Sequence, residues 1–350
     1  MRVTRSTLEQ AVACGVLSKP QASALWHFLS QKERDTPSFQ PAHILYYLGG
    51  MVAIGAMTLF MTLGWERFGG GGLLLISLLY CAAALLLTEF FLTRQHLAIP
   101  AGITATFAVV MVPLAVYGAQ HFLGFWIDGP RASAYRDYHY YIDWRWLIME
   151  LATLAAATAA LWRYRLPFLV MPVAVTLWYM SMDLTPFLFG GDAVEFFSER
   201  RKLVSTFFGL AMTLLAFVVD MRSYKSRDFA FWLYLFGVLT FWGGLSSMSS
   251  DSELNKLVYC GINLLMIAIG AALARRVFTV FGGLGVAFYL GHLSHTIFKD
   301  SLLFPVALTA IGLAIIGAGI YWQRNEAAIG ERLRSFLPPD LRDLIAHRAE

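Results

Sequence analysis

Residues 72–93 read GLLLISLLYCAAALLLTEFFLT, an apolar run whose only charged side chain, Glu89, lies near its end. Each residue of an α-helix rises about 1.5 Å, so about 20 residues cross the hydrocarbon core of a bilayer. Inside that core the backbone must satisfy its own hydrogen bonds, and a helix does so. The run is therefore predicted to be a membrane-spanning helix.

Further runs of similar length and composition lie on both sides of this one. The predicted spans cover residues 43–64, 72–93, 97–119, 146–163, 166–187, 203–220, 229–248, 256–274, 277–296 and 301–322. Several pairs are joined by short basic turns, which is typical of helical hairpins. The expected fold class is all-α: a polytopic transmembrane helical bundle of about ten spans, built largely from hairpins.

The composition excludes several other classes of protein. Hydrophobic residues make up 58% of the 350 residues and charged residues only 14%, against about 25% charged residues in a soluble domain. The net charge of +4 is too small for a nucleic-acid-binding surface. Cys14, Cys81 and Cys260 lie too far apart to indicate a disulfide framework or a zinc site. No cofactor is expected.

The basic residues indicate an orientation. With ten spans, two thirds of the 27 basic residues lie on the side that holds both termini. By the positive-inside rule this side is the cytoplasm. The one basic cluster that opposes the rule is Arg200-Arg201-Lys202, which falls on the outer side. Three parts are expected: a cytoplasmic helical hairpin (1–42), the transmembrane bundle (43–322) and a cytoplasmic amphipathic tail (323–350).

The N-terminal part contains the signals of two short helices. One is predicted over Thr7–Cys14 and ends before Gly15; the other is predicted over Lys19–Gln31, with Ser18 as its N-cap. Such a hairpin is too small to hold much of a core alone. We expect it and the tail, residues 323–350, to contact membrane lipids, a second copy of the chain or another protein.

The order of these segments resembles a known family. A G-[IL]-[ST]-x-x-Q pattern fits Gly15-Val16-Leu17-Ser18-Lys19-Pro20-Gln21 with one extra aliphatic residue, and Pro41-Ala42-His43-Ile44-Leu45-Tyr46-Tyr47-Leu48-Gly49-Gly50 then leads into the first span. This is similar to a family of uncharacterised bacterial predicted multi-pass membrane proteins with a short N-terminal cytoplasmic hairpin. The resemblance implies a location in the bacterial inner membrane, but no activity and no site residues.

Polar side chains near the outer ends of the spans are the candidate functional residues. Glu150, Asp183, His292 and His295 map to one outer layer, and Asn263 lies deeper in its span. Carboxylates and imidazoles can handle protons or bind a polar substrate. They can equally be solvated by headgroup water, so both interpretations remain open. The sequence predicts neither a catalytic group nor a metal site.

Three functions are compatible with these features. The first is a permease- or flippase-like protein that handles a small solute or lipid, as kinked helices and polar outer ends favour. The second is a non-transporting membrane scaffold or sensor that acts through its cytoplasmic ends. The third, an intramembrane enzyme that modifies lipid or envelope components, is least favoured, because the sequence has no recognisable catalytic constellation.

One spacing pattern concerns helix packing. Gly283, Ala287 and Gly291 recur every four residues and therefore share one face of the ninth span. Small residues at this spacing let two helix backbones approach closely. The pattern predicts that this face contacts a neighbouring helix.

Overall fold

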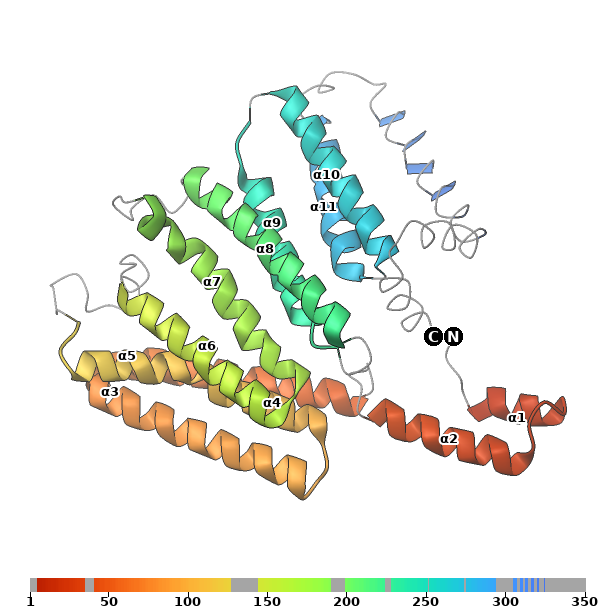
Figure 1. The fold of residues 1–350 in the computed structure, drawn as a ribbon, viewed down its shortest axis with the longest axis horizontal. Coiled ribbons are helices and arrows are strands. Elements are labelled where there is room, and N and C mark those ends of the chain that lie inside the picture. The colour runs from red at the N-terminus through yellow and green to blue at the C-terminus, as the bar shows by residue number, and fades with distance from the viewer. Residues whose placement is uncertain are drawn as a thin grey trace. The chain divides into compact units, whose positions relative to one another are not determined.

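The computed structural model describes residues 5–34, 41–126, 144–189, 199–223, 228–250, 252–273 and 275–293, together with scattered positions between 305 and 324. Every regular element in these ranges is a helix, as Figure 1 shows. The chain divides into two compact units. The first contains Met1–Tyr138 and Leu151–Leu169, and the second contains His139–Glu150 and Val170–Glu350.

Five helical segments are long and apolar enough to cross a membrane. They are Phe68–Thr93, Ala98–Phe122, Pro167–Leu184, Glu199–Ser223 and Glu253–Ala272. The protein is therefore an all-α membrane protein. Helices also form at the predicted spans 43–64, 146–163, 229–248 and 277–296, but these are not among the five. Most of the tenth predicted span, 301–322, lies outside the described residues, so the count of ten is not established.

The first unit begins with the two short helices expected from the sequence. Helix α1 covers Arg5–Ala13 and α2 covers Lys19–Arg34. Gly15 between them adopts a φ of +73°, which a glycine allows without steric cost. The backbone N–H and the hydroxyl of Ser18 both donate to Gln21 Oε1, at 3.0 and 2.9 Å. This side-chain contact fixes the start of α2.

The next element, α3 (Pro41–Thr93), contains two helices that correspond to the first two predicted spans. It is interrupted at Gly69, where φ is +60° and ψ is 179°. Only glycine adopts this backbone conformation readily, so the run of glycines at 69–72 explains the position of the kink. The unit is completed by α4 (Ala98–Val110), α5 (Val112–Phe122), the later part of α6 (Trp144–Tyr164) and a single 3-10 turn, Pro167–Leu169.

A polar contact connects α3 to the end of α6 within this unit. Arg163 Nη2 donates to Glu89 Oε1 at 3.0 Å, and the Tyr164 hydroxyl donates to the same oxygen at 3.1 Å. The Arg163 side chain is largely exposed, and the Glu89 side chain is 40% exposed. Exposed ion pairs contribute at most about 1 kcal/mol, so this contact adds little stability.

The second unit contains the start of α6 and five further helices. They are α7 (Val170–Phe189), α8 (Glu199–Ser223), α9 (Phe231–Ser247), α10 (Glu253–Ala272) and α11 (Arg276–His292). Helices α8 and α9 form one tightly packed hairpin and α10 and α11 form another, while α7 packs on both α8 and α9 (Figure 1). At Gly209 on α8 a Cβ atom would collide with the Phe241 backbone on α9, so only glycine permits this approach.

Among the described residues, the predicted packing face of α11 is not the face that contacts α10. Gly283 and Gly291 have open space where a Cβ atom would lie. The glycines that contact α10 are Gly282 and Gly285, whose added Cβ atoms would meet the backbone oxygen and the side-chain amide of Asn263, respectively. Both glycine faces of α11 are apolar, so the sequence pattern alone did not indicate which of them the neighbouring helix covers.

Candidate functional site

Glu150 is a buried acid in the second unit. It lies on the seventh residue of α6 and its relative exposure is only 7%. Neither of its carboxylate oxygens accepts a hydrogen bond from a donor group in the described part of the chain. A buried carboxylate without donors is costly, which indicates that Glu150 has another means of stabilisation.

Asp183 on α7 is the polar neighbour of Glu150. Its carboxyl group lies within hydrogen-bonding reach of the Glu150 carboxyl group, and the two interact electrostatically. Two ionised carboxylates have no proton to donate to each other, so a hydrogen bond between them requires one shared proton. The structure thus brings together two of the candidate residues as a carboxyl pair. Such pairs hold or release a proton according to their surroundings.

Arg201 on α8 is the third member of this cluster, and the sequence reasoning missed it. Its relative exposure is 6%, its Nε donates to the Met182 carbonyl oxygen at 3.0 Å, and its charge interacts with Asp183. One signal could have identified it. Arg200-Arg201-Lys202 is the basic cluster that opposes the predicted positive-inside bias, and a cation that departs from this bias is favoured by a nearby acidic side chain.

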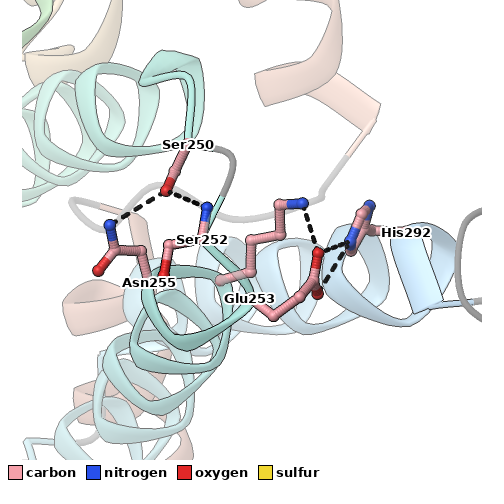
Figure 2. A network of polar contacts seen from close by, with 6 residues as sticks. Ser250, Ser252, Glu253, Asn255 and His292 are labelled. Atoms are coloured by element: carbon pink, nitrogen blue, oxygen red, sulfur yellow. Dashed lines mark hydrogen bonds and ion pairs between the residues drawn. The ribbon is translucent and has the colours of Figure 1, made fainter.

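His292 belongs to a different cluster. Its Nε2 lies 3.3 Å from both carboxylate oxygens of Glu253, and Lys256 Nζ donates to Glu253 Oε1 at 2.8 Å. Figure 2 shows Glu253 and His292 facing each other at the end of the α10–α11 hairpin, where α10 begins and α11 ends. The other predicted histidine, His295, lies outside the described residues.

A cavity of about 490 Å³ adjoins this second cluster. Its lining includes Lys256 and His292 together with serine, asparagine and aromatic side chains of α9, α10 and the segment between them. Pockets of about 300–1,000 Å³ with a few convergent polar groups are typical of small-molecule sites.

Asn263 is packed between helices and does not line this cavity. Its relative exposure is 0%, and its Nδ2 donates to the Tyr259 carbonyl oxygen at 2.8 Å. Its Oδ1 accepts no hydrogen bond in the part of the chain that the structure describes. The amide lies against Gly285 of α11, so the observed role of Asn263 is in the α10–α11 contact.

A third charged cluster lies at the opposite end of α8, and the sequence analysis did not identify it. Arg275, which precedes α11, donates from Nη2 to Asp220 Oδ1 at 2.8 Å and from Nη1 to Asp228 Oδ2 at 2.6 Å. Asp220 is only 3% exposed, and the guanidinium carbon of Arg275 stands 5.1 Å from the centre of the Tyr234 ring. A buried arginine that forms bidentate contacts and lies on an aromatic face stabilises the fold, unlike a solvated turn residue.

None of these clusters has the composition of a metal centre. Within the described ranges, no group of three or more histidine, cysteine, aspartate or glutamate side chains is placed to hold a metal ion. The carboxyl, imidazole and hydroxyl groups of these clusters can transfer protons and form hydrogen bonds to polar molecules.

Comparisons of the chain with protein-family models, with curated proteins and with solved structures found no match.

Proposed function

We propose that this protein is a membrane permease that couples the movement of a small solute to a proton, with Glu150 and Asp183 as the proton-handling pair. The observation that carries the proposal is the contact between these two carboxyl groups inside the helical unit. Ionisable side chains within membrane helices are energetically costly, and in transporters they commonly form proton relays.

The position of Arg201 supports a proton-linked role. When both carboxyl groups are ionised, the guanidinium group beside Asp183 compensates one of the two negative charges. When a proton binds, the two carboxyl groups share it and together carry one negative charge, which the single cation balances. The pair can therefore change its charge while part of the compensation stays in place, which is what reversible proton binding requires.

The helices that carry the cluster have two properties that support this proposal. Glu150, Asp183 and Arg201 come from α6, α7 and α8, so relative movement of any one helix would alter the contact. Helix α7 contains Pro172 and Pro186, and prolines weaken the backbone ladder and allow bending. Broken or bent helices around a polar site are common in secondary transporters.

We further propose the location, topology and binding partners of the protein. The protein crosses the bacterial inner membrane about ten times, with both termini in the cytoplasm, as the length of each apolar run and the basic residues favour. Its neighbours are membrane lipids and, at the α1–α2 hairpin, a second copy or another protein. Val16 and Leu25 of this hairpin are exposed apolar side chains that such a partner would cover.

Purified protein in liposomes that enclose a pH-sensitive dye tests the transport proposal. Glucose, alanine and succinate are added outside in turn, and the internal pH is followed. We expect one of them to produce acidification that is lost in Glu150→Gln and Asp183→Asn. The matched control is Glu89→Gln, because Glu89 is an exposed acid of the first unit and should leave the flux unchanged. Equal fluxes in Glu150→Gln and the unmodified protein would contradict the proposal.

A further inference from the structure

We infer that the cavity at the end of the α10–α11 hairpin binds a neutral polyhydroxylated molecule, such as a mono- or disaccharide. This binding site is separate from the Glu150–Asp183 pair, and the inference concerns binding alone, so it does not depend on transport. The argument uses the charges around the cavity, its hydrogen-bonding groups and its aromatic walls.

The cavity is formed entirely within the second unit. Its lining comes from the first residue of α8, the end of α9 with the segment that follows it, the first half of α10 and the last turn of α11. The volume of about 490 Å³ is within the size range of small-molecule pockets. It leaves room for one or two sugar rings.

Each acid at the cavity is already paired with a lysine. Lys256 and His292 both contact Glu253, at 2.8 and 3.3 Å, and Glu199 accepts from Lys202 at 2.7 Å. An anionic or cationic ligand would have to compete with these pairs for its counter-charge. A neutral ligand leaves the pairs intact and uses only hydrogen bonds, so the arrangement favours an uncharged molecule.

Neutral hydrogen-bonding groups form part of the cavity lining, and several are held in place by hydrogen bonds. Ser250 Oγ accepts from the Ser252 backbone N–H at 3.2 Å and from Asn255 Nδ2 at 3.1 Å. Figure 2 shows the Asn255 amide with its nitrogen toward Ser250 and its oxygen directed away from it. The hydroxyl groups of Ser246 and Tyr259 form a second contact at 2.8 Å. Hydroxyl groups both donate and accept, which matches the hydroxyl groups of a sugar.

Aromatic side chains complete the lining. Phe288 and Tyr289 on α11 and Tyr259 on α10 contribute rings to the cavity. Phe288 also packs against Trp242, with ring centres 5.6 Å apart, and this contact stabilises the orientation of the Phe288 ring. The face of an aromatic ring carries partial negative charge and attracts the weakly positive C–H groups on the flat side of a sugar ring. Rings beside hydroxyl and amide groups are therefore well suited to a carbohydrate.

Isothermal titration calorimetry on the full-length protein tests this inference. The protein is purified in a detergent without a sugar headgroup, because a glycoside detergent would compete for the cavity. The probes are glucose and maltose as neutral sugars, alanine as a zwitterion and succinate as an anion. We expect saturable heat from glucose or maltose and none from alanine or succinate. No saturable sugar binding to the folded protein, or preferential binding of alanine or succinate, would overturn the inference.

Two variants locate the binding. Asn255→Ala removes an amide at the cavity and Tyr289→Ala removes a ring; each should weaken sugar binding about tenfold, as expected for one good contact. Tyr179→Ala is the matched control, since Tyr179 is an exposed ring on α7 outside the cavity lining, and it should bind like the unmodified protein. Circular dichroism melts identify a variant that fails to fold, in which case Ser250→Ala replaces it. Unchanged affinity in the folded cavity variants would refute this location.

Discussion

Arg201 and Asp220 are buried charges at opposite ends of α8, nineteen residues apart in one helix. At about 1.5 Å per residue they are separated by about 28 Å, close to the thickness of a bilayer's hydrocarbon core. Each has an opposite charge on a neighbouring element: Asp183 for Arg201 and Arg275 for Asp220. The other buried residues of α8 are Val204, Gly209, Met212 and Ala216. The second unit therefore has two charged levels with an apolar section between them.

Replacing Arg275 with alanine should destabilise the protein strongly. The change leaves the buried Asp220 carboxylate without its bidentate partner, and breaking one side of a buried ion pair costs about 3–5 kcal/mol. Thermal unfolding in detergent, followed by circular dichroism, measures the loss. The matched control is Arg276→Ala, because Arg276 is the exposed neighbour and should change the melting temperature little. Equal melting temperatures for the two variants would show that the Asp220–Arg275 pair has no stabilising role.

Arg201→Gln should destabilise the protein more than Arg200→Gln. Arg201 is buried beside Asp183, whereas Arg200 is exposed on the same turn of α8. Without the guanidinium group, two buried carboxyl groups remain, and the expected loss is about 3 kcal/mol. Adding Glu150→Gln to Arg201→Gln removes one of the two acids, so the double variant should recover part of the lost stability. Strictly additive effects of the two changes would contradict the proposed coupling.

The Asn263–Gly285 contact predicts different effects at two glycines of α11. Gly285→Ala places a methyl group against the Asn263 amide and should destabilise the hairpin by about 1–3 kcal/mol. Gly283→Ala points into open space and should be neutral or slightly stabilising, because alanine favours a helix over glycine. Chemical unfolding in mixed micelles compares them. Combining Gly285→Ala with Asn263→Ala should restore part of the stability; identical losses with and without Asn263 would remove the basis for this packing assignment.

Reporter fusions test the proposed orientation. Alkaline phosphatase attached after Glu350 should be inactive, and a fluorescent protein attached there should fluoresce, because both readouts place the C-terminus in the cytoplasm. Alkaline phosphatase inserted after Gly129, in the segment predicted to lie outside, should be active. The opposite pattern at both positions would invert the topology, and activity at both would exclude the odd number of spans predicted between them.

Much of the fold follows from local features of the sequence. Helix α2 begins at Lys19 after the capping contact between Ser18 and Gln21, as the Ser18 N-cap predicted. The long apolar runs form helices at nine of the ten predicted positions in the described residues. The first two of these runs are two helices that meet at a kink at Gly69 within α3. These properties depend on a residue and its near neighbours in the chain, so the amino-acid sequence is enough to predict them.

The candidate site could be predicted only in part. Glu150 and Asp183 were recognisable because a charge in an apolar run is costly and unusual. Their mutual contact was not recognisable, and neither was Arg201, which stands eighteen residues after Asp183 on another helix. His292 was expected in the same layer as these acids, but its contact is with Glu253, an acid that the hydropathy pattern gave no reason to single out.

The sequence by itself determined that this is an all-α membrane protein, because the length and hydropathy of each segment set whether it can cross a bilayer. The tertiary structure decided which charges meet: Glu150 with Asp183, and Asp220 with Arg275. The physical reason is that a helix apolar on all sides has no polar stripe to indicate which face turns inward. Its rotation is set by close packing against its neighbours, and that packing depends on residues far apart in the chain.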